Sequence, residues 1–336
     1  MPRWPDLACG RYERLLAFDH ARREVVAIGP DNDGAQAARG WLDAPAPAAA
    51  PHGRLADELH VPDAAAHEAA VADVVARIAA GEIFQANIAR AWTGALAAGR
   101  RPFDLFAKLA GASPAPFAAY LRLPGLALVS NSPERFLRVT PAAGGLSAET
   151  RPIKGTVGRG ATSAEDEQLA ASLAASAKDR AENLMIVDLM RNDLARVATP
   201  GSVRVPALFA VERFTNVSHL VSTVTAELAP GRTALDAFAA AFPPGSITGA
   251  PKLQAMKVIA AHEPPRGPFF GAMFWAGFDG GLDSSVLIRT AAFVESGGGW
   301  RFEARAGGGV VADSDPAAER RETEAKIAAI LSALTT

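Results

Sequence analysis

The sequence predicts an α+β protein whose sheets are mainly antiparallel. Short apolar runs at 117–123, 126–130 and 136–139 are separated by turns that contain Pro or Gly, which is typical of consecutive strands in a sheet. Longer segments at 62–80 and 163–196 carry helix signals instead. With 336 residues and 49% hydrophobic content, the chain is long enough to bury a large core.

The N-terminal part differs in composition from the rest of the chain. Residues 12–28 predict a β-hairpin, because two apolar runs flank a polar turn. The stretch 44–51 is almost wholly Ala and Pro, which is typical of a connector. We therefore expect two parts: a short strand-rich segment with an Ala/Pro linker at 1–60, and a main domain at 61–336.

The segment 62–80 predicts a helix with one buried face, because its apolar residues recur at helical spacing and Gly81 follows them. In the strand expected next, Gln85 and Asn87 share one face, since side chains alternate along a strand. Two amides on one face are consistent with the polar lining of a site. They are equally consistent with a strand whose polar side meets water.

Ser163 and the acidic residues after it predict the start of a helix that reaches Arg196, with or without a break. Asp179 and Glu182 then lie on one face of that helix. Further strands are expected at 203–209, 214–217, 220–228, 267–273 and 285–293, and further helices at 253–261 and 313–334.

Charge and cysteine content exclude several classes of protein. Lys and Arg (34) nearly balance Asp and Glu (36), so neither a nucleic-acid footprint nor an acidic tail is visible. Cys9 is the single cysteine, which excludes an internal disulfide and suits a reducing compartment. No apolar run is long enough to predict a membrane span, and the N-terminus lacks the apolar core of a signal peptide. We expect a cytoplasmic protein that acts on a small molecule.

Lys154 is set in the sequence Arg-Pro-Ile-Lys-Gly-Thr at 151–156. Pro152 disfavours helix at the residue before it, and Gly155 permits a turn or a close approach to a ligand. Lys154 is therefore expected on a fixed, non-helical piece of chain, as a reactive amine requires. A solvated lysine in a surface loop is the alternative.

Three further polar residues are candidates for chemistry or binding. Glu134 follows a proline at a strand edge, where its carboxyl group could act as an acid; an exposed turn residue is the alternative. His219 lies inside a strand and would ordinarily be a hydrogen-bonded structural residue. Arg289 is expected inside an apolar strand, where an arginine is unfavourable unless it meets an anion or a carboxylate.

Two glycine-containing segments are candidates for ligand binding. The segment 242–252 is a Gly/Pro loop whose N–H groups, together with the hydroxyls of Ser246 and Thr248, could receive an anion. The glycines at 307–309 allow a ligand to approach the backbone closely, although three glycines alone are a weak signal.

The last helix carries a charged strip. At about 100° per residue, Glu319, Glu322 and Lys326 fall beside the apolar stripe of the helix. This strip could reach a site, and a surface ion pair between Glu322 and Lys326 is the alternative.

These segments together resemble the chorismate-utilising enzymes, the family of anthranilate, aminodeoxychorismate, isochorismate and salicylate synthases. The resemblance extends from about Gly81 to Leu334. It is carried in order by Phe84–Asn87, Ser132–Arg135, Arg151–Thr156, Ala181–Asp193, His219–Ser222, Pro244–Lys252, Ile288–Thr290, Ala306–Val311 and Glu322–Lys326. It implies a large sandwich of two antiparallel sheets flanked by helices, the fold of anthranilate synthase component I, here with a short N-terminal part.

The resemblance also implies a magnesium site and a chorismate site. Glu182 and Glu322 would hold Mg²⁺, with Asp179 nearby, and the ion would bind a carboxylate of chorismate. The residues expected to bind the substrate itself are Arg289, Gly307, Gly308, Gly309, Ser246, Thr248, Lys326 and Thr156. Among them, the arginine and the glycine backbone would receive the other carboxylate by charge-assisted hydrogen bonds.

Within the family, a lysine at the position of Lys154 is typical of aminodeoxychorismate synthases, whereas anthranilate synthases have alanine there. The resemblance implies that Lys154 attacks C2 of chorismate as the C4 hydroxyl leaves, and that ammonia then attacks C4 and expels the lysine. Glu134 matches the acid that protonates the hydroxyl, and His219 lies where the family positions that group. Gln85 stands where isochorismate and salicylate synthases have a lysine base, which argues against those two activities.

The expected product is 4-amino-4-deoxychorismate, on the route to p-aminobenzoate and folate. A separate glutamine amidotransferase subunit would supply the ammonia, because Cys9 lies in no glutaminase motif. An anthranilate synthase is the alternative within the family, and a non-catalytic chorismate-binding paralogue is the alternative outside enzymes, suggested by the short N-terminal part. Two positions depart from the family: Phe269 stands where Tyr or Trp is usual, and Ala325 where some relatives have an acidic residue.

Overall fold

The computed structural model describes residues 4–45, 52–214 and 217–336. The chain divides into a smaller unit, Arg3–His52, and a larger unit that begins at Gly53. Most of the linker expected at 44–51 lies outside the described residues. No helix in the described part of the chain is long and apolar enough to cross a membrane.

The smaller unit contains the predicted hairpin, in which β1 (Leu15–Asp19) pairs antiparallel with β2 (Glu24–Ile28). The helix α1 (Asn32–Arg39) and the 3₁₀ turn Gly40–Asp43 follow it. The carboxylate of Asp31 caps α1 by accepting a hydrogen bond from the N–H of Gly34.

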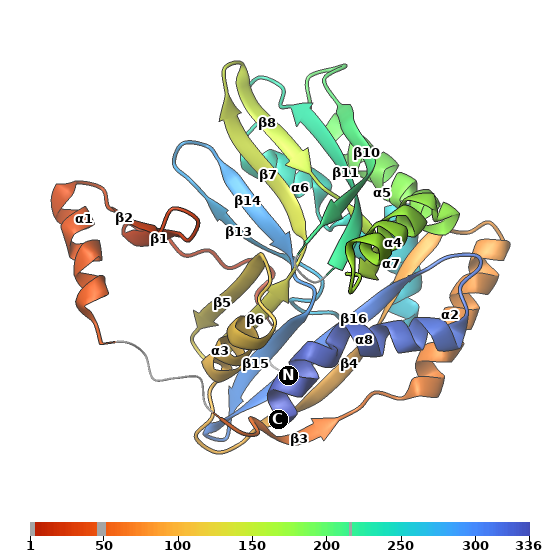
Figure 1. The fold of residues 1–336 in the computed structure, drawn as a ribbon, viewed down its shortest axis with the longest axis horizontal. Helices are drawn as coiled ribbons and strands as arrows, with labels where there is room; N and C mark the ends of the chain where they lie inside the picture. The colour runs from red at the N-terminus through yellow and green to blue at the C-terminus, as the bar shows by residue number, and fades with distance from the viewer. Residues whose placement is uncertain (1–3, 46–51, 215–216) are drawn as a thin grey trace. The chain divides into compact units, whose positions relative to one another are not determined.

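The larger unit is built on two seven-stranded antiparallel sheets (Figure 1). Sheet I has the strand order β12-β4-β16-β15-β6-β5, and β3 also pairs with β4. Its strands are β3 (Ala56–His60), β4 (Gln85–Leu96), β5 (Phe117–Leu123), β6 (Leu126–Ser132), β12 (Gly249–Ala250), β15 (Thr290–Ser296) and β16 (Gly299–Val310). Because β3 pairs with β4, residues 56–60 belong to the larger unit, although they precede the expected boundary at residue 61.

Sheet II has the strand order β10-β11-β8-β7-β14-β13, and β9 also pairs with β11. Its strands are β7 (Arg135–Ala142), β8 (Gly145–Thr150), β9 (Ile153–Gly158), β10 (Arg204–Arg213), β11 (Val217–Glu227), β13 (Ala272–Ala276) and β14 (Leu282–Val286). Part of the strand expected at 214–217 lies outside the described residues, and β11 begins at Val217.

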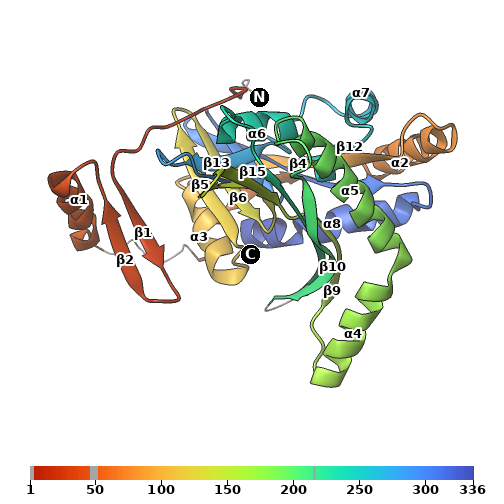
Figure 2. The same cartoon turned by 90° about the horizontal axis from the view of Figure 1, so that it is seen from above.

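Helices pack on both sheets (Figure 1). Sheet I is covered by α2 (Ala64–Ala79), α3 (Pro102–Ala112) and α8 (Pro316–Thr335), and α7 (Lys252–His262) packs beside β4. Sheet II is covered by α4 (Ser163–Ala175), α5 (Ala177–Ala195) and α6 (Ala234–Ala241). The segment expected at 163–196 is broken at Ser176, whose hydroxyl caps α5, and Figure 2 shows the change of direction there.

The apolar core of sheet I fixes α8, the helix that carries Glu322 and Lys326. Trp92, Phe293, Phe302 and Ile327 are almost fully buried in one cluster between the sheet, α3 and α8. Burial of side chains of this size stabilises a fold by about 1.5–3 kcal/mol each.

Two predicted strands are wrong in their limits. The strand expected at 267–273 begins only at Ala272, because Gly271 donates to the carbonyl of Pro268 and closes a turn. The single strand expected at 285–293 is two strands, β14 in sheet II and β15 in sheet I. Arg289 therefore lies between two sheets and not inside a strand, and its φ of 48° is in the left-handed region that side chains rarely adopt.

Candidate active site

Glu134 lies between β6 and β7, with its carboxyl group enclosed by protein. Its Oε1 accepts a hydrogen bond from Ser246 Oγ at 3.1 Å. Burial raises the pKa of Glu134 to about 7, although this hydrogen bond and the charges of Lys154, Lys326 and Arg289 all act to lower it. The carboxyl group therefore exchanges its proton near neutral pH, as a general acid requires. A cavity of about 10 Å³ beside it, just large enough for one water molecule, is lined by Thr150, Ile186, Met190 and Ser246 among others.

Lys154 lies on β9, with 15% of its side chain exposed. Its Nζ donates to Glu182 Oε2 on α5 at 3.1 Å. Gly155 has φ 76°, and a Cβ there would lie 2.9 Å from Cγ of Asp179, so glycine is needed where this strand passes α5. The expected fixed, non-helical setting of Lys154 is present.

The strand β16 of sheet I passes close to the side chain of Lys154. A Cβ at Gly309 would lie 3.2 Å from Lys154 Nζ and 3.1 Å from Gln85 Nε2, and one at Gly308 would lie 2.5 Å from Glu319 Oε2. A side chain at Gly309 would fill the space in front of Lys154 and Gln85, and a side chain at Gly308 would meet the carboxylate of Glu319 on α8. Gly309 therefore keeps open the space around the amine of Lys154, and Gly308 keeps open the space beside Glu319.

Two carboxylates of α8 face this glycine strand. Lys326 Nζ donates to the carbonyl of Gly307 at 3.0 Å and pairs with Glu322 Oε1 at 2.5 Å. Burial acts to raise the pKa of Glu322, but Lys326, Lys154 and Lys178 outweigh it and hold the pKa below its usual value. Glu319 is 5% exposed, its Oε1 accepts from Ser314, and its Oε2 has no partner among the described residues.

Arg289 and His219 both follow Glu134 in the sequence. Arg289 lies close enough to interact with the charges of Glu134 and His219. Burial lowers the pKa of Arg289, and the carboxyl of Glu134 is the charge that opposes this effect. Within residues that the structure describes, no carboxylate forms an ion pair with this guanidinium. His219 Nδ1 and Thr156 Oγ1 are hydrogen bonded at 2.8 Å, and burial lowers the pKa of His219, so its ring is neutral at pH 7.

Ser246 and Thr248 have different roles in the loop between α6 and α7. Ser246 reaches Glu134, as described above. Thr248 is 4% exposed and donates to the carbonyl of Pro244 at 3.0 Å, so its hydroxyl proton is used within the loop. The structure therefore places Ser246 at the site and Thr248 behind it.

The donor set suits Mg²⁺, which prefers carboxylate oxygens and completes its shell with water and substrate. The described residues 4–45, 52–214 and 217–336 contain no group of three or more His, Cys, Asp or Glu side chains that could hold a metal ion in their present arrangement. Glu182 and Glu322 are instead each paired with a lysine. Glu319 supplies a buried oxygen without a partner beside Glu322, and this oxygen fits a cation.

Two site residues were not in the predicted set. Glu319 was placed on the charged strip of the last helix but not at the metal, because helical spacing does not show which residue of a strip is buried. Gln85 is fully buried, and neither of its side-chain polar atoms has a partner in the described part of the chain. The period-two pattern of Gln85 and Asn87 was the available signal for it.

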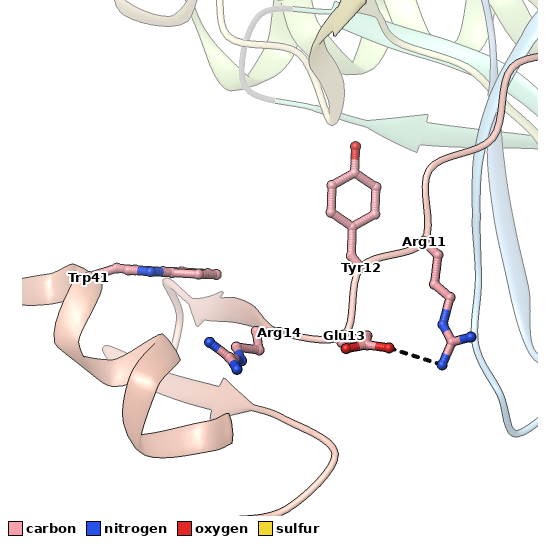
Figure 3. Close-up of a pocket in the computed structure, with 5 residues that line it drawn as sticks. All are labelled: Arg11, Tyr12, Glu13, Arg14 and Trp41. Carbon is pink, nitrogen blue, oxygen red and sulfur yellow. Dashed lines mark ion pairs between the residues drawn. The ribbon is translucent and has the colours of Figure 1, made fainter. Parts of the chain in front are cut away.

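A separate hollow in the smaller unit is a weaker candidate. It measures about 340 Å³ and is lined by Arg11, Tyr12, Glu13, Arg14 and Trp41 (Figure 3). All five residues are exposed, and Arg11 and Glu13 form an ion pair at 3.0 Å. Exposed side chains do not hold the fixed, desolvated geometry that catalysis needs.

Comparisons with known proteins show the family of the chain. The model of the family described as chorismate binding enzyme matches residues 1–332. The chain therefore belongs to the chorismate-binding enzymes, and the predicted family is confirmed.

Two curated relatives and one solved structure are similar to this chain over most of its length. The chain is 44% identical over 329 residues to aminodeoxychorismate synthase component 1 of Klebsiella aerogenes, which covers 97% of this chain and 70% of that protein. It is 40% identical over 357 residues to anthranilate synthase component 1 of Streptomyces coelicolor, covering 99% and 68%. The crystal structure of anthranilate synthase component I from Streptococcus pneumoniae superposes with a TM-score of 0.80 at 28% identity, covering 94% and 71%. The predicted α+β fold is thereby confirmed.

Proposed function

We propose that the chain converts chorismate and ammonia into 4-amino-4-deoxychorismate, the activity for which its Klebsiella relative is named. The observation that carries the proposal is that an amine and a proton-bearing carboxyl group share one site. Lys154 supplies the amine, and burial keeps Glu134 partly protonated at neutral pH. A protein that only bound chorismate would need neither group.

The proposed reaction uses the two groups in sequence. The unprotonated Nζ of Lys154 forms a bond to C2 of chorismate, the two ring double bonds shift, and the C4–O bond breaks. The hydroxyl leaves as water with the proton of Glu134. Ammonia then forms a bond to C4, the double bonds shift back, and the bond between Nζ and C2 breaks. The proton that the new ammonium group loses returns to Glu134, so both groups are restored.

The remaining residues would bind and orient the substrate. Arg289, whose guanidinium forms no ion pair with a carboxylate in the described part of the chain, would receive one carboxylate, and the backbone of the glycines at 307–309 would lie against it. Glu182, Glu322 and Glu319 would hold Mg²⁺, which when bound would neutralise the other carboxylate of the substrate. His219, neutral and hydrogen bonded to Thr156, would orient the leaving hydroxyl toward Glu134.

Product analysis tests the proposal. Purified protein is incubated with chorismate, Mg²⁺ and an ammonium salt, and the products are identified by mass spectrometry. We expect aminodeoxychorismate from the wild type and a loss of at least about 10³-fold in Lys154→Ala, or diversion to anthranilate. Lys257→Ala, which changes an exposed lysine on α7, is the matched control. Absence of aminodeoxychorismate from the wild type, although chorismate binds, would contradict the proposal.

Anthranilate formation is the second candidate, because the Streptomyces coelicolor relative covers almost the whole chain. Lys154 argues against it, since the resemblance places alanine at this position in anthranilate synthases. The same mass spectra distinguish the two, because the aromatic product lacks the enolpyruvyl group.

A partner is part of the proposal. The term component 1 in the names of the relatives suggests a second component, and we propose that it is a glutamine amidotransferase. Glutamine should then support the reaction only when an amidotransferase subunit is added, whereas ammonium should support it alone. Reaction with glutamine in the absence of any partner would contradict this.

A further inference from the structure

A buried ion pair closes the loop that carries Ser246. Lys252 Nζ donates to Asp193 Oδ2 at 2.7 Å and to the carbonyl of Ala241 at 2.9 Å. The side chains are only 14% and 5% exposed. Replacement of a buried ion pair by apolar residues is often neutral for stability, so this pair calls for a reason other than stability.

The pair joins three elements at one point. Ala241 is the last residue of α6, Lys252 is the first of α7, and Asp193 lies near the end of α5. One ammonium group therefore ties together both ends of the loop 242–251 and attaches them to α5. The loop itself contains no charged residue.

The middle of the loop is wedged between α5 and sheet I. A Cβ at Gly245 would lie 2.4 Å from Leu189 Cδ2 of α5, so the loop backbone touches that helix. On the other side, the carbonyl of Thr248 accepts from the N–H of Asn87 at 2.8 Å, and Arg266 donates to the carbonyl of Ile247 at 2.9 Å. Between these contacts Ser246 donates to the carboxyl of Glu134.

We propose that Asp193 and Lys252 are positioning residues, which hold the loop so that Ser246 stays on the carboxyl group of Glu134. This inference rests on the proposed function only in giving Glu134 the role of acid. Neither residue touches the reacting atoms, and both act through Ser246. A displacement of about 1 Å at such a position can reduce a rate by about 10²-fold.

A variant that keeps the fold but removes the ion pair between Asp193 and Lys252 tests the proposal. In the double variant Asp193→Leu with Lys252→Met, no unpaired charge is left buried, so thermal stability should change little. The contact with the carbonyl of Ala241 is lost, and kcat should fall about tenfold or more with a smaller change in KM. Lys252→Arg should restore most of the activity, and Lys257→Met on the same helix should leave kcat unchanged.

A double-mutant cycle shows whether the effect passes through Ser246. In a background that keeps Ser246, the changes Asp193→Leu and Lys252→Met should together move the limb of the pH–rate profile that reports Glu134. In a Ser246→Ala background, the same change should leave that limb where Ser246→Ala placed it. Full additivity of the two effects, or a fall in melting temperature with kcat and the pH profile unchanged, would overturn the proposal.

Hydrogen exchange of the loop gives a readout that does not depend on the reaction. Amides in 242–251 should exchange faster in the double variant than in the wild type, while amides of β15 should not change. Unchanged exchange in the loop would overturn the proposal that Asp193 and Lys252 hold the loop, even if the enzyme is active. Faster exchange in the double variant of a chain that makes no aminodeoxychorismate would support the role of Asp193 and Lys252 in holding the loop, and would contradict the proposed function.

Discussion

Two carboxyl groups of this chain are held at opposite extremes of acidity by their surroundings. The Glu134 carboxyl group accepts one hydrogen bond from a side chain among the described residues, from the hydroxyl of Ser246, and burial raises its pKa to about 7. Asp166, on α4, accepts two hydrogen bonds from Arg159, at 2.6 and 2.8 Å, and one from the N–H of Gly160. Arg159 and this N–H lower the pKa of Asp166 to about 2. The comparison shows that the kind of partner, and not burial of the residue alone, separates a carboxyl group built for proton transfer from one built to stay ionised.

The largest expected difference between the two residues is in activity. Glu134→Gln removes the transferable proton while it keeps the shape of the side chain, so kcat should fall by about 10²–10⁴-fold. Asp166→Asn should leave kcat per folded molecule nearly unchanged, because the hydrogen bonds of the Asp166 carboxylate go to Arg159 and Gly160 and to none of the proposed reacting groups. Steady-state kinetics with chorismate and ammonium measure both. Equal losses in the two variants would break the comparison.

The second difference is the sign of the effect of Glu134 on stability. Its pKa is about 7 in the folded chain and about 4.5 in the unfolded chain, so the folded state holds more protons between these values. The free energy of unfolding contributed by Glu134 is therefore highest below pH 4.5 and falls as the pH rises to 7. Glu134→Gln should stabilise the protein by up to about 3 kcal/mol at pH 8 and by little at pH 4.5. Urea unfolding at the two pH values tests this, and a destabilised variant at pH 8 would contradict it.

Asp166 should show the opposite dependence. Its folded pKa of about 2 lies below the unfolded value of 3.8, so its contribution is present above pH 3.8 and is lost as the pH falls toward 2. Asp166→Asn should lower the melting temperature at neutral pH, and the difference from the wild type should shrink as the solution is acidified. Arg122→Gln, which removes a half-exposed pair with Glu295, is a control expected to have little effect. If the melting temperatures of the wild type and Asp166→Asn still differ as much at pH 2, Asp166 stabilises the protein by packing instead of by charge.

The smallest expected effect sharpens the description of Glu134. The hydrogen bond from Ser246 lowers the pKa of the carboxyl group, so Ser246→Ala should raise it. The limb of the pH–rate profile that reports the acid should move to higher pH by less than about one pH unit. The profile of kcat/KM in the free enzyme is the measurement. A shift to lower pH would mean that water entering the site outweighs the lost hydrogen bond.

The sequence predicted those parts of the fold that depend on neighbouring residues. The hairpin at 12–28, the helix at 62–80 and the strands at 117–130 are present where their turn and periodicity signals placed them. Three helices, α1, α3 and α6, were missed although each begins with a recognisable signal. Asp31 caps α1. α3 starts with Pro102, and the side chain of Asp104 accepts a hydrogen bond from the N–H of Arg101. α6 starts with a capping box formed by Thr233 and Asp236.

The site was predicted as a set of residues but not as an arrangement. Ser246 and Glu134 are 112 residues apart in the chain, and no local pattern shows that they meet. Arg289 was expected within a strand, because the apolar residues around it hide the crossing from one sheet to the other. The roles of the catalytic and metal-binding residues stay predictions, since they depend on a substrate and an ion.

The helix α5 contacts both the proposed nucleophile, Lys154, and the residue proposed to hold the Ser246 loop, Lys252. α5 carries Glu182, which binds Lys154, and Asp193, which binds Lys252; at about 1.5 Å per residue the two lie about 16 Å apart along one rigid axis. Catalytic competence should therefore arise in one step during folding, when α5 docks on sheet II, and not by separate maturation of two half-sites. Turnover is then a sensitive assay for the docking of this helix, and a ligand that loosens α5 would inhibit without entering the active site.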